Sequence, residues 1–382
     1  MPLDAECLKA AARDRTGLTD FGDAPMDEGL GVLVASVNET GTTPRELAAV
    51  EATILAALIE RLRVEDWVAR HPDVLDQEIK APVFVVGLPR SGTTALSQFL
   101  AEDPAARSLL RWETLNAIPP PDPAGPEDPR LAATRKAFEA RDLAMPMYRA
   151  MLPVNAEDPA EHSPILGLTF LNIGTSLVHH APAYQAWLLS QDLRPGYAYL
   201  KKVLQILQSN TGASHWNLKA PLDIFGLDAL VEVFPDARLV WCHRDPASSI
   251  PSNCSLLAMI REASGEQVDR VALGRMKLDV FALGMARALT ARDRLGEARF
   301  TDVIQRRLVA DTVGTLETLY AGVGLKFTEA YRRRLTERVA SRNAVMAGKS
   351  HPYALADFGL SLLEVRTGFA AYLARFNPPL EA

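Results

Sequence analysis

The fold class is decided by one stretch of the sequence, Pro82-Val83-Phe84-Val85-Val86-Gly87-Leu88-Pro89-Arg90-Ser91-Gly92-Thr93-Thr94. Its apolar, β-branched first half predicts a buried strand, and the residues from Ala95 onward have the pattern of a helix. Between them lies a loop bounded by Gly87 and Gly92. This is the layout of a phosphate-binding loop, because backbone N–H groups and the positive end of a helix dipole converge there on an anion.

The loop differs from that of a nucleotide triphosphatase in the position of its cation. A triphosphatase carries lysine after the second glycine, whereas this chain has Thr93 there and holds Arg90 inside the loop. The cation is therefore placed for a different anion.

The composition is that of an ordinary globular protein, with 48% hydrophobic residues among 382. The net charge of −6 argues against broad attraction to nucleic acid or to an acidic membrane surface. The N-terminus lacks the pattern of a signal peptide and no apolar run is long enough to span a membrane. Three cysteines suit a reducing compartment, so we expect a cytoplasmic protein.

Strand and helix patterns alternate through most of the remaining chain. Helical patterns separate the strand-like segments, which fall at residues 106–112, 214–219, 237–244 and 300–304. This alternation predicts an α/β fold in which a parallel, P-loop-type sheet is flanked by helices on both faces.

Two helical regions are expected outside the sheet. Residues 1–80 predict a helical N-terminal extension that packs on the core domain, residues 81–382. Within it, Thr43-Pro44-Arg45-Glu46 has the pattern of a helix start. A second helical region, at about 130–212, follows a proline-dense loop and is expected to form a wall of a substrate pocket.

Polar residues lie where the predicted strands end, which is where open parallel sheets bind their ligands. They are the loop around Arg90, then Glu113, Lys219 and Arg244. Ser252 follows Arg244 by eight residues, on the predicted next helix. An arginine fork with a hydroxyl is suited to grip a phosphate monoester.

These motifs resemble those of the sulfotransferases that use 3′-phosphoadenylyl sulfate (PAPS). The glycine-bounded loop is similar to their 5′-phosphosulfate loop, and Arg244 with Ser252 is similar to their 3′-phosphate site. Among these enzymes, the tyrosylprotein sulfotransferases and a group of bacterial relatives of unassigned substrate have the most similar motifs. The bacterial relatives share further segments with this chain, namely Trp112-Glu113, Trp216-x-Leu218-Lys219-x-Pro221, Phe234-Pro235-Asp236-Ala237 and the stretch from Tyr353 to Leu360.

The resemblance implies a role for each residue. The 5′-phosphate and sulfuryl group would be held by Arg90, Ser91, Gly92, Thr93 and Thr94, and the 3′-phosphate by Arg244 and Ser252. Lys219 would stabilise charge on the leaving phosphate oxygen, and Glu113 would be the general base that accepts the acceptor's proton. Direct stabilisation by arginine and lysine leaves no metal required, and the product would be 3′,5′-adenosine bisphosphate.

Several assignments stay open at this point. His162, His179 and His180 are rival bases, and Lys349 and His351 are further candidates for the 3′-phosphate.

The acceptor is constrained by one departure from the family pattern. Leu115 stands where the tyrosylprotein enzymes have a substrate-contacting arginine, which disfavours acidic peptides and favours a small-molecule or lipid acceptor. The hypothesis is therefore a sulfotransferase acting on a hydroxyl. A P-loop small-molecule kinase and a non-catalytic nucleotide-binding relative are the alternatives, and assembly as a homo-oligomer is left open.

Overall fold

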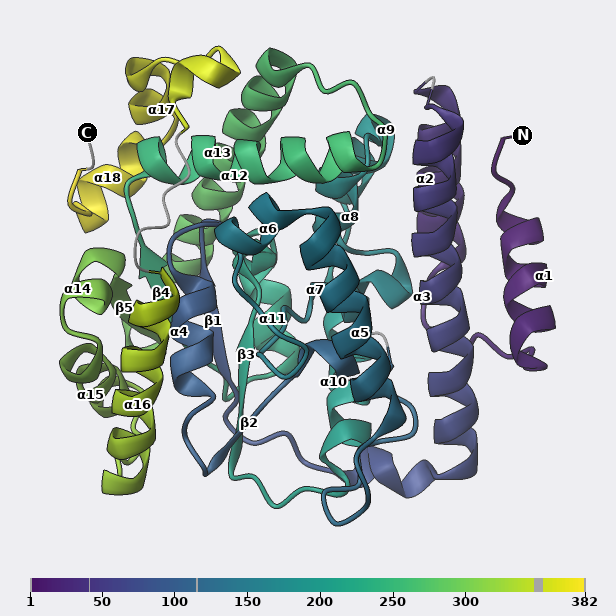
Figure 1. Cartoon of the computed structure of the whole chain (residues 1–382), viewed down its shortest axis with the longest axis horizontal. Coiled ribbons are helices and arrows are strands. Elements are labelled where there is room, and N and C mark those ends of the chain that lie inside the picture. The colour runs from purple at the N-terminus through teal and green to yellow at the C-terminus, as the bar shows by residue number, and fades with distance from the viewer. Residues whose placement is uncertain (1, 41, 115, 347–352, 381–382) are drawn as a thin grey trace.

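A computed structural model describes residues 2–40, 42–114, 116–346 and 353–380. Five parallel strands form its central sheet in the order β2-β3-β1-β4-β5 (Figure 1). Their bounds are β1 Val83–Gly87, β2 Ala106–Ser108, β3 His215–Lys219, β4 Arg238–His243 and β5 Phe300–Ile304. The predicted parallel sheet is confirmed, although the segment expected as a strand over 106–112 is a shorter strand followed by a 3-10 turn, Arg111–Glu113.

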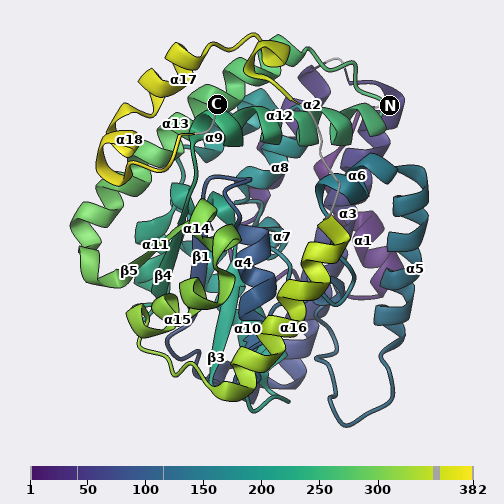
Figure 2. The same cartoon turned by 60° about the vertical axis from the view of Figure 1, so that its left-hand side comes forward.

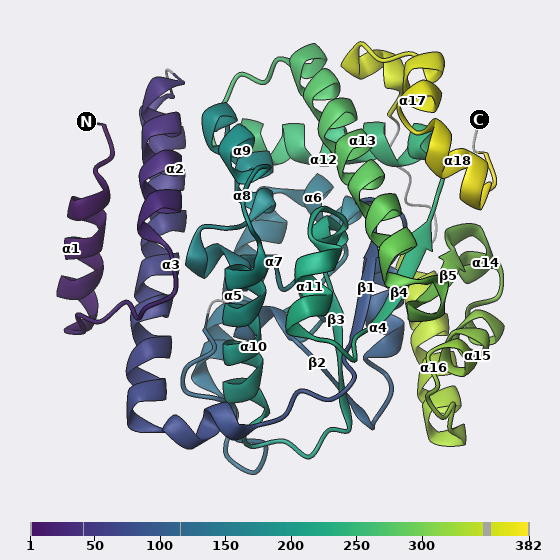
Figure 3. The ribbon, with the colours of Figure 1, turned by 180° about the vertical axis from the view of Figure 1, so that it is seen from behind.

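The sheet is covered on both faces because alternate side chains of its strands are buried on opposite sides. Val83 and Val85 of β1 belong to the core under α4, α14, α15 and α16 (Figure 2), whereas Phe84 and Val86 pack on the side of α10, α11 and α13 (Figure 3). The bounds of these helices are α4 Thr93–Leu100, α10 Arg194–Gln208, α11 Leu227–Val233, α13 Arg270–Leu295, α14 Gln305–Ala310, α15 Thr312–Gly322 and α16 Glu329–Met346.

Three helices precede the sheet and lie side by side at one edge of the molecule (Figures 1 and 3). They are α1 Ala5–Thr16, α2 Asp27–Glu39 and α3 Pro44–Arg70. The helix start predicted at Thr43 is confirmed and forms a capping box, since Glu46 N donates to Thr43 Oγ1 and Thr43 N donates to the Glu46 carboxylate. Buried Arg61 of α3 donates to the carbonyl oxygens of Phe21, Ala24 and Leu168, which ties the helices to the rest of the fold. The boundary expected at residue 80 stays a prediction.

The region between β2 and β3 is helical, as expected from its sequence. Its helices before α10 are α5 Pro129–Ala144, α6 Pro146–Met151, α7 Ser163–Leu166, α8 Ile173–Val178 and α9 Pro182–Leu188. After β4, Asp245 caps α12 (Pro246–Ala263), because its side chain accepts a hydrogen bond from Ala247 N. Helices α17 Leu362–Gly368 and α18 Ala370–Phe376 end the described chain. Among the described residues, no helix has the length and apolar character needed to cross a bilayer.

Candidate functional site

The glycine-bounded loop joins the central strand β1 to helix α4. Gly87 has φ 141°, and a Cβ on it would lie 2.5 Å from the Cys242 carbonyl oxygen of neighbouring β4. Only glycine permits this close approach of two backbones. Arg90 has φ 69°, a left-handed conformation that is rare for residues with a side chain and occurs at functional sites.

The structure brings Arg90, Arg244 and Ser252 together at the ends of β1 and β4. Arg90 Nε donates to Ser252 Oγ at 3.2 Å, and Arg90 Nη2 donates to the Met151 carbonyl oxygen at 3.1 Å. Arg244 Nη1 donates to the Arg90 carbonyl oxygen at 3.0 Å. Two residues far apart in the sequence, predicted to hold different phosphates, are therefore in direct contact.

A cavity of about 380 Å³ opens at this cluster. Its walls include the loop and strand-end residues Arg90, Gly92, Thr93, Thr94 and Arg244. Ser91 and Ser252 are buried behind these walls, with 0% and 1% of their surface exposed. We call this space the nucleotide cavity.

A third arginine lines the nucleotide cavity from helix α16. Arg342 donates through Nη1 to Gln98 Oε1 at 2.9 Å, and burial lowers the pKa of its guanidinium. Sequence reasoning missed Arg342, because α16 is rich in arginine and such a run is typical of a solvated helix face.

The electrostatics of the nucleotide cavity favour a polyanion. Burial lowers the pKa of Arg90, and the nearby charge of Arg244 acts in the same direction. The described residues lining the cavity include one carboxylate, Glu161, against three guanidiniums. Asn253 Oδ1, on the same wall, is buried without a hydrogen-bond partner in the described part of the chain. These groups fit a nucleotide that carries several anionic groups.

Lys219 ends strand β3 beside this cavity and is 1% exposed. Its Nζ lies 2.9 Å from Glu161 Oε1. Burial lowers the pKa of Lys219, against the opposing effect of Glu161. Burial alone would raise the pKa of Glu161, but the charges of Lys219 and Arg111 outweigh it and the pKa is lowered. Glu161 is therefore an ionised carboxylate next to an ammonium group.

A second, larger cavity of about 630 Å³ adjoins the first. Both are lined by Thr94, Leu152, Glu161, Gly174 and Val178. The walls of the second cavity are mainly apolar and come from helices α2, α3, α5 and α6 and the segment around α8, including Leu33, Ile54, Ala57, Phe138, Tyr148 and Phe170. We call this space the acceptor cavity. The N-terminal helices, expected only to pack on the core, thus also form part of its wall.

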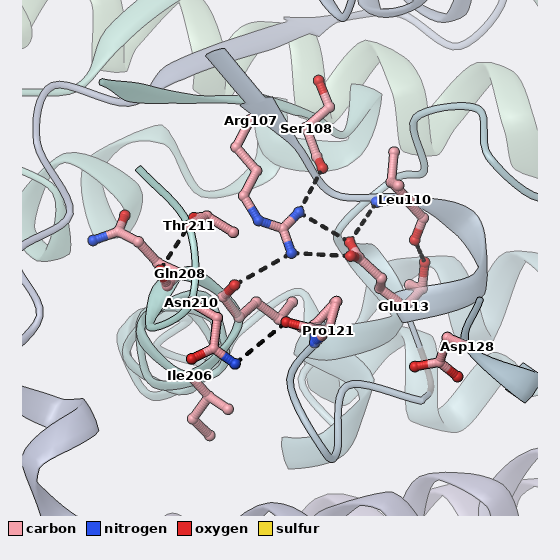
Figure 4. Close-up of polar contacts among 12 residues, drawn as sticks. Arg107, Ser108, Leu110, Glu113, Pro121, Asp128, Ile206, Gln208, Asn210 and Thr211 are labelled. Atoms are coloured by element: carbon pink, nitrogen blue, oxygen red, sulfur yellow. Dashed lines mark hydrogen bonds and ion pairs between the residues drawn. The ribbon is translucent and has the colours of Figure 1, made fainter. Parts of the chain in front are cut away.

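Glu113 lines neither cavity, although its neighbours Arg111 and Thr114 line the acceptor cavity. Its carboxylate accepts from Arg107 Nη2 at 2.9 Å and Nη1 at 3.2 Å, and from Leu110 N at 3.0 Å (Figure 4). The Arg107 guanidinium also stacks on the Trp216 ring. Only 2% of the Glu113 side chain is exposed, and its ion pair with Arg107 connects β2 to the turn that follows. This geometry argues against the predicted role of Glu113 as general base.

The rival histidines occupy three different environments. His162 is fully buried with Nε2 3.0 Å from Asp223 Oδ1, and it lines neither cavity. His179 lines the acceptor cavity, where burial lowers its pKa to about 4. His180 Nδ1 lies 3.4 Å from Arg261 Nη2. Leu115, Lys349 and His351 lie outside the described residues.

The fold and site together define a class. A parallel sheet whose central strand ends in a glycine-bounded anion loop, with a half-buried arginine at the end of the neighbouring strand, is typical of P-loop-type enzymes that transfer a group from a nucleotide. The chain belongs to the sulfotransferase family, whose family model matches residues 82–329.

Solved structures of two mycobacterial sulfotransferases are similar over nearly the whole chain. Sulfotransferase STF9 from Mycobacterium avium is 31% identical with a TM-score of 0.89, covering 99% of this chain and 98% of that one. Sulfotransferase STF1 from Mycobacterium tuberculosis is 30% identical with a TM-score of 0.81, covering 97% and 99%.

A further mycobacterial relative is similar over a shorter region. The omega-hydroxy-beta-dihydromenaquinone-9 sulfotransferase Stf3 of Mycobacterium bovis is 25% identical over 268 residues. The match spans 68% of this chain and 66% of that relative, just under two thirds of its length.

Proposed function

We propose that this protein transfers a sulfuryl group from PAPS to a hydroxyl of a small, lipophilic acceptor and releases 3′,5′-adenosine bisphosphate. One observation carries the proposal. A cavity with three arginines on its walls adjoins a mainly apolar cavity at the Lys219–Glu161 pair. This arrangement suits a reaction between an anionic nucleotide and an apolar alcohol.

Residues of the nucleotide cavity have distinct tasks in this reaction. When bound, the nucleotide supplies the sulfuryl group and a phosphate leaving group. Arg90 and the N–H groups that begin α4 hold the phosphosulfate end, and Arg244 with Ser252 hold the 3′-phosphate. Arg342 adds a third cation to the walls of this cavity.

Lys219 is placed to stabilise the negative charge that develops on the leaving oxygen. Its burial makes this stabilisation strong, because an ammonium group acts over a longer range in a poorly hydrated site than in water. Preorganisation also contributes, since β3 holds the lysine in place before any ligand binds.

The acceptor cavity indicates the kind of alcohol. Its volume of about 630 Å³ is ample for a drug-sized molecule, and most of its lining surface is apolar. The name of the Mycobacterium bovis relative describes a sulfotransferase of a menaquinone derivative, which is a lipophilic molecule. We place the reaction in the cytoplasm, because Cys7, Cys242 and Cys254 are all free thiols.

Ligand-induced thermal stabilisation tests the donor. The bisphosphate at about 100 times its Kd should stabilise the protein by about 2.7 kcal/mol. ATP with Mg²⁺ serves as the comparison. Stabilisation by ATP with Mg²⁺ but not by the bisphosphate would contradict the proposal and support a small-molecule kinase.

A further inference from the structure

Glu161 lies at the junction of the two cavities and lines both of them. Its side chain is 39% exposed, whereas its partner Lys219 is 1% exposed. The pair therefore has a buried cationic end and an accessible anionic end. A group that must reach the acceptor and the sulfuryl group together has to lie at such a junction.

The backbone around Glu161 is held on both sides. Ala160 N donates to the Leu109 carbonyl oxygen at 2.7 Å, and His162 N donates to the Lys219 carbonyl oxygen at 3.2 Å. The His162 ring is fixed in turn by Asp223, whose Oδ1 also accepts from Tyr197 Oη at 2.8 Å. Glu161 is therefore positioned by a buried network, which makes it a preorganised group rather than a mobile surface carboxylate.

The two carboxylate oxygens of Glu161 are used differently. Oε1 accepts from Lys219, while Oε2 accepts no hydrogen bond from the part of the chain that the structure describes. Arg111, which also lines the acceptor cavity, adds a second nearby cation that keeps the carboxylate ionised. An ionised oxygen without a protein donor is available to a ligand hydroxyl in either cavity.

We propose that Glu161 is the general base of the reaction, a step that rests on the proposed function. The acceptor oxygen forms a bond to sulfur as the bond from sulfur to the 5′-phosphate oxygen breaks. The electron pair of the broken bond stays on that phosphate oxygen, where Lys219 stabilises it. The hydroxyl proton passes to Glu161 and afterwards to water, so that the products are a sulfate ester, the bisphosphate and one proton.

The pair with Lys219 links the two halves of the reaction. While Lys219 is paired with Glu161, the carboxylate stays ionised and ready. As Lys219 interacts more strongly with the developing phosphate charge, its hold on Glu161 weakens. The proton affinity of Glu161 then rises at the stage when the hydroxyl proton becomes acidic.

The other candidates are less well placed. Glu113 is buried and its carboxylate is held by Arg107, and His162 lines neither cavity. His179 lines the acceptor cavity but not the nucleotide cavity.

The test is Glu161→Gln, assayed with sulfur-labelled PAPS and a panel of long-chain alcohols and prenylated phenols. Turnover should fall at least about 100-fold, the contribution typical of a general base. Affinity for the bisphosphate should stay within threefold or become tighter, because a negative charge beside an anion cavity has been removed. The matched control is Glu157→Gln, which removes an exposed carboxylate paired with Arg135 and should retain wild-type turnover.

Three further variants keep the outcome decisive. Glu161→Asp preserves the charge beside Lys219 but withdraws the carboxylate, so it should fold like wild type and lose turnover. His179→Asn and Glu113→Gln test the rivals. Wild-type turnover in Glu161→Gln would overturn the assignment of Glu161 as general base but not the proposed function. Loss of turnover in Glu113→Gln or His179→Asn, while Glu161→Gln retains it, would do the same. A wild-type protein that labels no member of the panel would count against the proposed function itself.

Discussion

The two cavities that meet at Glu161 are built in opposite ways. The nucleotide cavity takes two of its charged groups, Arg90 and Arg244, from short motifs at the carboxyl ends of β1 and β4. The acceptor cavity takes its walls from residues between 33 and 179, and apart from Thr94 none of these lining residues belongs to a motif. The difference indicates that the donor site is set by a few residues with fixed chemistry, whereas the acceptor site is set by the shape of an apolar surface. Variants should therefore separate the two cavities cleanly.

Lys219→Met should have the largest effect in this comparison. The substitution removes the cation that stabilises the leaving oxygen, so turnover should fall about 100- to 1000-fold. The measurement is the rate of bisphosphate release under saturating donor. Lys202→Met is the matched control, because Lys202 also forms a lysine–glutamate pair, but its partner Glu65 lines neither cavity, whereas Glu161 lines both. A Lys219→Met protein with near wild-type turnover would remove Lys219 from the chemistry.

Arg90→Ala should weaken the donor side next. Loss of charge-assisted hydrogen bonds worth about 3 kcal/mol lowers affinity roughly 100-fold. Titration calorimetry with the bisphosphate measures this directly. Arg135→Ala removes a surface arginine and should leave affinity unchanged. Equal affinity in both variants would mean that the nucleotide does not bind at the loop.

Ala57→Leu should act on the acceptor side alone. The added carbons enter the acceptor cavity, so kcat/KM for a bulky acceptor should fall about tenfold or more. This is the loss expected when one or two methylene groups of a substrate no longer fit an apolar pocket. Affinity for the bisphosphate should not change. Ala56→Leu, at an exposed position of the same helix, is the control. Equal losses in both variants would indicate that α3 does not wall the acceptor site.

The pH dependence of turnover should show the smallest effect, an alkaline limb that lies below the ordinary pKa of lysine. Activity requires ionised Glu161, which is lost as pH falls, and charged Lys219, which is lost as pH rises. Because the pKa of Glu161 is lowered beside Lys219 and Arg111, the acid limb should lie below about pH 4.3. Burial lowers the pKa of Lys219, so the alkaline limb should begin below about pH 10.4.

Removing Glu161 should move that alkaline limb further. Glu161 is the group that raises the pKa of Lys219 against burial and the repulsion of Arg111. In the residual activity of Glu161→Gln the limb should therefore shift to lower pH. Rate measurements across the alkaline range check this, and an unshifted limb would show that the pair does not control the protonation of Lys219.

The comparison of the cavities also explains how much the sequence could predict. The loop at Arg90, the strand ending at Lys219 and the Arg244–Ser252 spacing were predictable, because each depends on local strand, turn and helix patterns. Their meeting at one edge follows from parallel strand order. The sheet and its helical covering were confirmed for the same reason.

Groups whose position depends on tertiary packing were not predictable. Glu161 lies in an irregular segment, and only the fold brings it to Lys219. Arg342 reaches the nucleotide cavity from a helix more than two hundred residues after the loop. The contacts of Glu113 were not predictable either, because its carboxylate is held by Arg107, a partner that strand and turn patterns do not reveal.

The central claim is tested most directly by following labelled sulfate. Wild-type protein is incubated with sulfur-labelled PAPS and the panel of hydrophobic alcohols, and both the extracted product and the bisphosphate are measured. The account predicts a labelled sulfate ester and bisphosphate in equal amounts, with at least about 100-fold less of both formed by Lys219→Met over the same period. Tight binding of the bisphosphate without transfer of label to any acceptor would contradict it and identify a nucleotide-binding relative without catalytic activity.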